Sequence, residues 1–284
     1  MRVILFTDIP VWVRPLAGKL EARGAEVVTA AAVEDVPDDG LIVNRISTLL
    51  FRKQPEMGAD FLAALEGWER EGRAMVNGPR VLALGVSKLA QAGFFEDAAL
   101  ATPRTMRAEP GKRALPGRRV LVKPGAGGFG KDIFELDGDR AVPPLRGGDA
   151  VEWVEQEHVA PVDGAVHRVE FVGDTILYDA CSGIRTQDYN YCLANTEAEV
   201  ELRPEAEMLP LAASQARMVA RKAGMELGAV EYLVGEGRVP HFIDLNPVSS
   251  LHPGAVTMLG ADPLDLTAEF LLRRAGASTG EVPQ

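Results

Sequence analysis

A glycine-rich segment in the middle of the chain most constrains what the chain can fold into. It runs from Gly125 to Gly130 as G-A-G-G-F-G and fits the G-x-G-x-x-G pattern of dinucleotide-binding proteins letter for letter. Those proteins need a helix directly after the glycines, so that the helix N-terminus meets the pyrophosphate. Here residues 119–123 have strand character, and residues 131–136 alternate like a second strand. The sequence therefore predicts a β-hairpin with a glycine-rich turn and not a Rossmann fold.

Such a hairpin can bind a nucleotide. Glycines let backbone N–H groups approach phosphate oxygens closely, and a flexible hairpin can fold over a bound nucleotide. Protein kinases have a comparable hairpin, but their lysine follows the loop, whereas Lys123 precedes it and no H-R-D or D-F-G follows. A structural turn without a ligand is the alternative. Four glycines within six residues, with no Asn or Asp, are unusual for such a turn.

A second polar cluster lies in a predicted hairpin further along the chain. Residues 226–233 and 239–245 have strand patterns around a turn at 235–237. Glu231 and Asp244 lie at similar distances from the turn, so cross-strand pairing would bring them together, and Asn246 shares the face of Asp244. Two carboxylates and an amide oxygen suit Mg²⁺. The alternative, two solvated surface acids, fits less well because both acids lie within apolar strands.

The first 78 residues alternate between strand and helix patterns. Strands are expected at residues 2–6, 26–29, 41–44 and 74–77, and helices at 11–23 and around Phe61, Leu62, Leu65 and Trp68. Strands separated by helices predict a small parallel sheet. Gly78-Pro79 then marks a boundary. We therefore expect a β/α domain at residues 1–78, a larger domain at 79–277 and a tail at 278–284.

The larger domain is expected to contain strands and a few helices. The pattern is helical over residues 82–100, and the basic stretch 108–118, rich in Pro and Gly, is expected to be an exposed connection. Further strands are expected at residues 151–159, 167–172 and 175–178, with a hairpin turn at 172–175, and further helices at 204–223 and 263–275.

The composition argues against several classes of function. The chain has 284 residues and a net charge of −11, which argues against binding nucleic acid or an anionic membrane surface. The cysteines, Cys181 and Cys192, form no C-x-x-C pair, which fits a reducing compartment. The apolar run at residues 3–6 is too short for a signal peptide or a membrane span. We expect a cytoplasmic protein.

Together these segments resemble the ATP-grasp superfamily, and within it the RimK/LysX type of carboxylate–amine ligase, which modifies a ribosomal protein or acts in lysine biosynthesis. The resemblance implies an α/β (α+β) ATP-grasp fold with a small parallel-sheet domain before the grasp, a central β-rich lid subdomain at about residues 101–157 and a C-terminal α+β subdomain. It covers about residues 75–272 and depends on the order of V-N-G-P-R, S-K-L-A-Q, A-T-P-R-T, L-V-K-P with the glycine loop, V-E-Q-E-H-V, R-V-E-F-V-G-D, G-A-V-E-Y-L and I-D-L-N-P.

The resemblance also implies roles for individual residues. Lys88 would reach the α-phosphate of ATP and Lys123 the α- and β-phosphates. Asp163 would bind the ribose hydroxyls. Arg168 and Arg185 would lie near the transferred phosphoryl and acyl groups. Three further groups match the family: the lid residues Gly125, Gly127, Gly128, Phe129 and Gly130; the adenine linker Glu155, Gln156, Glu157, His158 and Val159, acting chiefly through backbone groups; and the magnesium ligands Glu231, Asp244 and Asn246.

Each of these roles has a plainer alternative. Lys88 or Lys123 could be a surface lysine. Arg168 could simply pair with a strand acid, and Arg185 could be an arginine that binds no substrate anion. Cys181 is expected to pack rather than to act as a nucleophile, and we expect His252 to be structural or exposed.

The sequence departs from the family in segments that normally shape the acceptor site. Ala165, Val166 and His167 precede Arg168, where relatives usually have an acid. P-V-S-S-L-H-P-G follows Asn246 in place of a stretch of small residues, and no arginine stands just before Asn195. The resemblance therefore supports the ATP site better than the substrate site.

These observations predict an ATP-dependent carboxylate–amine ligase. A carboxylate would attack the γ-phosphate to form an acylphosphate, and an amine would then displace phosphate to leave an amide and ADP. The expected cofactors are ATP and two Mg²⁺ ions. Mn²⁺ is expected to be able to replace Mg²⁺. The expected partners are a small carboxylate and an amine, an amino acid or a peptide, and a second copy in a homodimer. The alternatives are a small-molecule kinase on the same scaffold and a non-catalytic ATP-binding protein.

Overall fold

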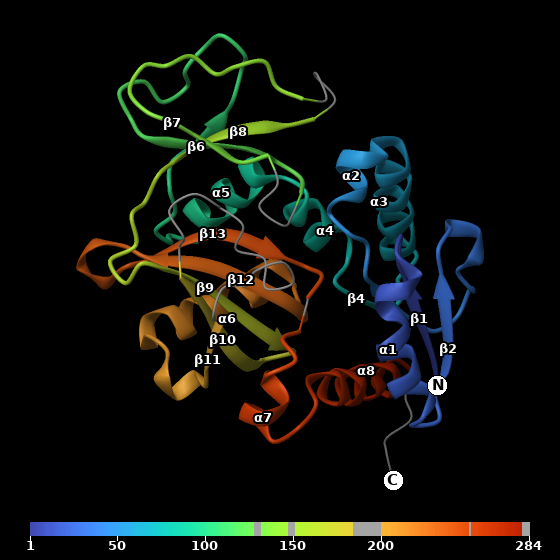
Figure 1. The fold of residues 1–284 in the computed structure, drawn as a ribbon. Helices are drawn as coiled ribbons and strands as arrows, with labels where there is room; N and C mark the ends of the chain where they lie inside the picture. Colours follow the sequence, from blue (N-terminus) through green and yellow to red (C-terminus); the bar gives the residue numbers. More distant parts are fainter. Residues whose placement is uncertain (128–131, 147–150, 184–199, 250, 280–284) are drawn as a thin grey trace.

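The structure is a computed structural model that describes residues 1–127, 132–146, 151–183, 200–249 and 251–279. Within these ranges the strands form three sheets. Figure 1 shows the N-terminal sheet (blue) beside the C-terminal sheet (yellow and orange), with the middle sheet (green) above the C-terminal one.

The predicted small parallel sheet is confirmed in the N-terminal part, with the order β2-β1-β3-β4. Because alternate residues of a strand face opposite sides, Val3 and Leu5 pack toward α1 and the C-terminal helix α8 (Pro263–Thr279), whereas Ile4 and Phe6 pack toward α3. The elements here are β1 (Arg2–Phe6), α1 (Pro10–Glu21), β2 (Glu26–Ala30), a 3₁₀ turn (Val33–Asp35), β3 (Leu41–Asn44), α2 (Leu50–Lys53), α3 (Pro55–Arg70) and β4 (Met75–Val76).

The helical pattern at residues 82–100 corresponds to two helices and not one. α4 (Pro79–Gly85) ends before Ser87, which is extended and accepts a hydrogen bond from the Ala90 N–H as the N-cap of α5 (Lys88–Asp97). Serine is a preferred N-cap because its hydroxyl satisfies an N–H that has no partner within the helix. The break places Lys88 at the first position of α5.

The glycine-rich hairpin belongs to an antiparallel sheet with the order β5-β8-β6-β7. Its strands are β5 (Thr105–Arg107), β6 (Val120–Pro124), β7 (Phe134–Leu136) and β8 (Trp153–Glu157). Pairing of β6 with β7 confirms the predicted hairpin. The basic stretch between β5 and β6 is more than an exposed connection, because Leu115 is buried in the core of this sheet and the Arg113 side chain is only 5% exposed.

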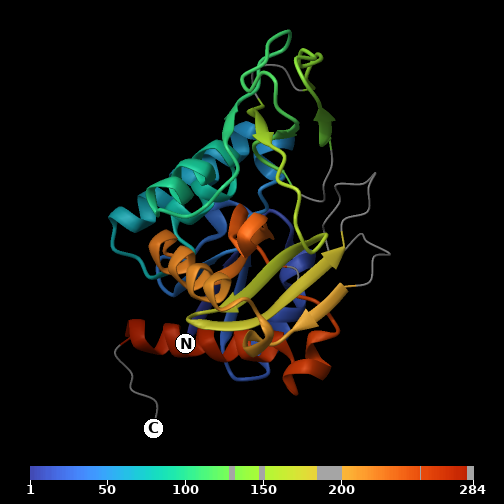
Figure 2. The same cartoon turned by 90° about the vertical axis from the view of Figure 1, so that its left-hand side faces the viewer.

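The C-terminal sheet is antiparallel with the order β11-β10-β9-β12-β13. The predicted turn at residues 172–175 joins β9 and β10, where Val172 is opposite Thr175. The helical pattern at residues 204–223 begins as a 3₁₀ turn (Glu205–Glu207) and becomes α6 (Pro210–Ala223), which packs on one face of the sheet (Figure 2). The remaining elements are β9 (Ala165–Val172), β10 (Thr175–Gly183), β11 (Val200–Arg203), β12 (Leu227–Val234), a 3₁₀ turn (Glu236–Arg238), β13 (Pro240–Asn246) and α7 (Ala255–Leu259).

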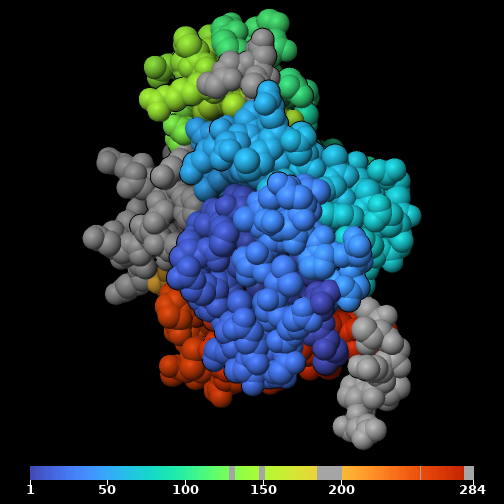
Figure 3. Space-filling view, turned by 90° about the vertical axis from the view of Figure 1, so that its right-hand side faces the viewer, coloured from blue at the N-terminus to red at the C-terminus, as the bar shows by residue number. Residues whose placement is uncertain are grey.

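The C-terminal helix returns to the N-terminal sheet. α8 contacts α1 and β1 (Figures 1 and 2). One hydrophobic core joins Val3 and Leu5 of β1 with Tyr178 of β10, Leu227 of β12 and Leu271 of α8. Figure 3 shows the N-terminal residues (blue) as a broad surface between the lid residues (green) and the C-terminal residues (red). The boundary at 78/79, the lid at about 101–157 and the tail at 278–284 stay predictions.

The architecture agrees with the expected fold class, a parallel-sheet domain, a β-rich lid and a C-terminal α+β part. No described helix combines the length and the apolar character that a membrane span requires.

Candidate functional site

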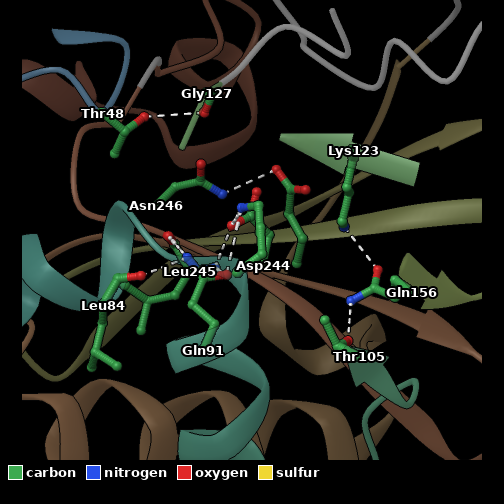
Figure 4. A network of polar contacts seen from close by, with 12 residues as sticks. Thr48, Leu84, Gln91, Thr105, Lys123, Gly127, Gln156, Asp244, Leu245 and Asn246 are labelled. Carbon is green, nitrogen blue, oxygen red and sulfur yellow. Dashed lines mark hydrogen bonds and ion pairs between the residues drawn. The ribbon is translucent and has the colours of Figure 1, made fainter. Parts of the chain in front are cut away.

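The glycine hairpin is held against two other parts of the molecule. The Gly125 N–H donates to the Glu152 carbonyl (2.7 Å), and the Gly125 carbonyl accepts from the Lys88 N–H (3.2 Å). A Cβ on Gly125 would approach the Glu152 Cγ to 2.9 Å, so only glycine fits without a shift. Thr48 of the N-terminal domain donates to the Gly127 carbonyl (3.1 Å; Figure 4). Gly128, Phe129 and Gly130 lie outside the described residues.

Lys123 is buried on β6 and points across the sheet to β8. Its Nζ donates to the Gln156 Oε1 (2.8 Å), and the Gln156 Nε2 donates to the Thr105 hydroxyl (3.0 Å; Figure 4). Burial lowers the Lys123 pKa to about 8, and the nearby Lys88 charge lowers it too, against the opposing charges of Asp244 and Glu231. Lys123 is therefore a poorly solvated cation that donates to an amide oxygen, and a phosphate would stabilise its charge.

The predicted adenine linker has its side chains largely occupied. Glu155 is fully buried, pairs with Arg113 (3.1 Å) and accepts the Ala114 N–H (2.7 Å) and the Leu115 N–H (3.1 Å). Glu157 forms an ion pair with Arg118.

The linker backbone is also partly paired. The Glu157 N–H donates to the Arg104 carbonyl and the His158 N–H to the Arg119 carbonyl, both at 2.9 Å. Burial and the Arg119 charge lower the His158 pKa. The side chain of Val159 is partly buried. Adenine binding by this linker stays a prediction. It would use backbone N–H and C=O groups of the linker that are not already hydrogen-bonded.

Asp163, the predicted ribose ligand, contacts the buried His167 ring, which the sequence did not indicate. Its Oδ2 lies 2.8 Å from His167 Nε2, and the other ring nitrogen lies 2.8 Å from Asp179 Oδ2. The His167 ring stacks on Tyr232 at 4.6 Å between ring centroids. Burial lowers the His167 pKa, but the hydrogen bonds and charges of the two aspartates outweigh it and raise the pKa overall. His167 stands where relatives of the resembled family usually have an acid, and here it orients Asp163.

The predicted metal ligands come together on one face of the C-terminal sheet. Glu231 on β12 is directly opposite Asp244 on β13, as the hairpin pattern predicts. The Asn246 Nδ2 donates to the Glu231 Oε1 (3.2 Å; Figure 4). Burial raises the pKa of Glu231, and the negative charge of Asp244 adds to this effect. The pair therefore needs a compensating cation when both carboxylates are charged.

Two cations of the protein form ion pairs with these acids, and a third interacts with both through its charge. Lys88 Nζ forms an ion pair with Asp244, and both side chains are largely buried. Arg168 Nη1 donates to the Glu231 Oε1 (2.7 Å), while its Nε donates to the Glu170 Oε1 (2.6 Å). Lys123 is coupled to both acids through its charge. Neither Lys88 nor Lys123 is the surface lysine considered as an alternative, because each is only 8% exposed.

Arg168 pairs with strand acids, as its alternative predicts, and a role near the phosphoryl group stays a prediction. Burial lowers its pKa, but Glu170 and Glu231 outweigh this and raise the pKa above the ordinary arginine value. Arg185 lies outside the described residues. Cys181 is buried with its pKa raised to about 11 by burial, which fits packing. The His252 Nδ1 accepts the Gly254 N–H (3.0 Å), and a structural role for His252 stays a prediction.

The acid pair fits a hard divalent cation by its donor set. Two facing carboxylates and an amide oxygen offer the oxygen ligands that Mg²⁺ takes, with water and phosphate completing the shell. Within the described ranges, no group of three or more His, Cys, Asp and Glu side chains is arranged to hold a metal. Phosphate oxygens would therefore have to supply part of any coordination shell.

Several residues that position this site are not predictable from the sequence patterns. Gln91 on α5 is buried and bonds the backbone of Leu245 beside Asp244, donating to its carbonyl and accepting from its N–H, each at 3.2 Å (Figure 4). Asn77, at φ +58°, donates to the Leu227 carbonyl (2.6 Å) and the Pro247 carbonyl (3.0 Å). The V-N-G-P-R motif indicates a boundary, but its asparagine also ties β4 to the C-terminal sheet.

Similar folds are found among solved structures. The ATP-grasp ligase PsnB, complexed with minimal precursor, Mg and ADP, matches with a TM-score of 0.63 and 16% identity over 96% of this chain and 97% of that chain. A RimK domain ATP-grasp protein from Sphaerobacter thermophilus matches at 0.65 and 18% over 96% and 100%. D-alanine–D-alanine ligase from Bacillus anthracis matches at 0.69 and 13% over 99% and 98%.

Sequence comparison adds nothing to these matches. No protein-family model matches the chain, and no curated protein sequence matches it either. The structural similarity extends over nearly the whole of this chain and of each compared chain. The chain therefore has the ATP-grasp fold.

Proposed function

We propose that this protein is an ATP-dependent carboxylate–amine ligase. One observation carries the proposal: the facing acids Glu231 and Asp244 are paired with Arg168 and Lys88, and their charges act on the buried Lys123 of the glycine hairpin. Opposed acids and cations at one place can bind a triphosphate together with divalent metal.

The residues divide between metal and phosphate. Glu231, Asp244 and Asn246 would hold Mg²⁺, which neutralises charge on the phosphates when it is bound. We propose two ions, with Mn²⁺ able to replace them. Lys88 would exchange its contact with Asp244 for the α-phosphate, and Lys123 would bind the α- and β-phosphates. The backbone of the glycine loop would cover the β- and γ-phosphates.

The reaction is a phosphoryl transfer followed by acyl transfer. A substrate carboxylate oxygen attacks the γ-phosphorus, the bond to the β-phosphate oxygen breaks, and ADP leaves. An amine nitrogen then attacks the acyl carbon, forms the amide and releases inorganic phosphate, while its proton passes to solvent or a base. The protein contributes positioning and charge neutralisation, with Arg168 and Arg185 near the transferred groups.

The amine is proposed to be an amino acid or a peptide. PsnB was solved with a minimal precursor, and D-alanine–D-alanine ligase joins two amino acids by its name. PsnB was also solved with a precursor peptide, so these two compared proteins support a peptide or an amino acid as the substrate class proposed here. The homodimer expected from the sequence remains part of the proposal.

A screen of phosphate release tests the proposal. The full chain is incubated with Mg²⁺, ATP and pairs of small acids and amines, and products are identified by mass spectrometry. A ligase releases phosphate only when both an acid and an amine are present. A kinase would instead form a stable phosphoester without free phosphate, and a non-catalytic protein would bind ATP without turnover.

Matched variants separate the site from general effects. Asp244→Asn removes one acid of the facing pair and is expected to reduce phosphate release at least a hundredfold. Glu236→Gln changes an exposed acid in the turn of the same hairpin and should leave the rate within twofold. Equal rates in Asp244→Asn and the unmodified protein would rule out the proposed site.

A further inference from the structure

A cavity of about 400 Å³ lies between the N-terminal domain and the C-terminal sheet. It is bounded by α1, by the ends of β9 and β12, by the segment after β13 and by the start of α8. Small-molecule sites commonly have volumes of about 300–1,000 Å³ and are mostly apolar, with a few polar groups that fix the ligand. The cavity has this size and its lining includes Trp12, Leu16, Val172, Leu227 and Leu264.

The polar side chains that line the cavity differ in whether their hydrogen-bonding groups already have partners in the protein. The Thr267 hydroxyl donates to the Pro263 carbonyl (2.8 Å), and the Ser249 hydroxyl donates to the buried Glu170 carboxylate. Arg45 donates from Nη2 to the Ser249 carbonyl (3.2 Å), but among the described residues its buried Nε has no hydrogen-bond partner. Arg45 is therefore the polar group of this lining with unused hydrogen-bonding capacity.

The charge of Arg45 is poorly compensated. Burial lowers its pKa to about 10, although the negative charge of Glu170 acts in the opposite direction. Glu170 is shared, since it also accepts from Arg168 and from Ser249. A guanidinium with a free donor in a desolvated position gains both a hydrogen bond and a counter-ion when a carboxylate binds.

A series of side-chain contacts links the lining of the cavity to the acid pair. Two of the cavity's lining residues, Val248 and Ser249, are separated from Asn246 in the chain only by Pro247. Ser249 contacts Glu170, which contacts Arg168, which contacts Glu231. A ligand held at Arg45 would therefore be linked to Glu231 through Ser249, Glu170 and Arg168.

We propose that this cavity binds the carboxylate substrate, and that this substrate is an amphipathic acid with an apolar group of the size of a leucine or phenylalanine side chain. Arg45 binds the carboxylate, and the apolar group fills the space between α1, β12 and α8. The inference rests on the proposed ligase function and specifies the class of acid that the ligase takes. A small hydrophilic acid would leave the apolar lining in contact with water.

Direct binding tests the inference independently of turnover. Titration calorimetry on the full chain compares 4-phenylbutyrate with its primary amide and with acetate. We expect 4-phenylbutyrate to bind at least tenfold more tightly than either, because the amide lacks the charge and acetate lacks the apolar group. ADP with Mg²⁺ is titrated in parallel to measure nucleotide binding.

Variants assign the two parts of the ligand to their contacts. Arg45→Gln should reduce the preference for the acid over its amide to less than threefold, and Arg45→Lys should retain part of it by keeping the charge. Leu264→Trp places bulk in the cavity and should weaken 4-phenylbutyrate binding at least tenfold. Leu272→Trp, at a partly buried position of the same helix outside the cavity, should change it less than twofold. Circular dichroism verifies the fold of each variant.

The outcomes distinguish this inference from the proposed function. If 4-phenylbutyrate does not bind to a protein that binds ADP, or binds no better than its amide or acetate, the inference is wrong and the ligase proposal is unaffected. If Leu264→Trp and Leu272→Trp weaken binding equally, the ligand does not occupy the cavity and the inference is wrong. If the acid binds as expected but ADP and ATP do not, the ligase proposal fails while the acid site stands.

Discussion

Lys88, the first residue of α5, forms an ion pair with Asp244 of β13, which is 156 residues further along the chain. Asp244 in turn is directly opposite Glu231. The lysine therefore compensates one of two neighbouring carboxylates whose charges oppose each other. The same side chain is predicted to bind phosphate, so nucleotide binding would require that metal replace Lys88 as the partner of Asp244.

The ion pair predicts a stability difference between two lysine variants. Lys88→Met should lower the free energy of unfolding by about 2 kcal/mol, because a largely buried carboxylate loses its charged partner. Lys112→Met, at an exposed pair with Glu109, should change the stability much less, because solvent screens this pair. Urea denaturation followed by circular dichroism measures both. Equal losses in the two variants would show that the buried position of the pair does not matter.

Gly125 predicts a specific steric effect. Gly125→Ala brings a Cβ against the Glu152 side chain, which accepts a hydrogen bond from the Ser87 hydroxyl (2.9 Å) at the start of α5. The variant should lose about 1–3 kcal/mol of stability through overpacking. Combining it with Glu152→Ala removes the clashing atoms, so the double variant should be more stable than the sum of the two single changes predicts. If the stability changes of Gly125→Ala and Glu152→Ala were additive, the added Cβ would not contact the Glu152 side chain.

Gly93 supplies the matched control for that substitution. It lies within α5, and a Cβ added at this position would have nothing within 4 Å. Because alanine is a better helix former than glycine, Gly93→Ala should stabilise the protein by about 0.5–1 kcal/mol. Thermal or urea unfolding of the two alanine variants should therefore give effects of opposite sign.

The lowered pKa of Lys123 predicts that the protein takes up a proton when ATP binds. With a pKa of about 8 in the free protein, part of the Lys123 population is neutral at pH 8.5, and a nearby polyphosphate would raise this pKa. ATP affinity should therefore fall as the pH rises above 8. Calorimetry at pH 8.5 in buffers of different ionisation enthalpy should detect uptake by the unmodified protein and less by Lys123→Arg, whose guanidinium stays charged. The exposed Lys112→Arg substitution should leave the uptake unchanged, and equal uptake in all three proteins would assign the proton to another group.

Much of the fold could be predicted because period and turn chemistry are local properties. The two strand patterns and the turn at 235–237 were enough to bring Glu231 and Asp244 together, because both lie at similar distances from the turn, and the register confirms this pairing. The strand pattern after the glycines likewise excluded a Rossmann helix and predicted the β6–β7 hairpin. The break between α4 and α5 could not be predicted because apolar spacing continues through Ser87, whose capping role depends on backbone geometry.

The contacts that complete the site depend on residues far apart in the chain. Arg45, Glu170 and Ser249 have no shared sequence pattern, and only packing of the N-terminal sheet against the C-terminal one brings them together. Asn77 could be recognised as a turn residue, but not as a donor to the carbonyls of Leu227 and Pro247. The role of such residues follows from tertiary structure, which the local periods do not specify.

His167 predicts how stability depends on pH. Its ring is hydrogen-bonded to Asp163 and Asp179, and although burial alone lowers its pKa, these carboxylates raise the pKa overall. A histidine whose pKa is raised in the folded state contributes stability that is fully present below its unfolded pKa of about 6.5 and is lost as the pH rises through the folded value. The difference in unfolding free energy between the unmodified protein and His167→Gln should therefore be largest near pH 5.5 and shrink toward pH 8.5. Tyr232→Phe removes the neighbouring hydroxyl contact with Asp179 (3.3 Å) but keeps the imidazole, so it should retain the pH dependence. Urea denaturation across this range decides the matter: a difference for His167→Gln that does not change with pH would mean that the imidazole is not held as a cation between the two aspartates.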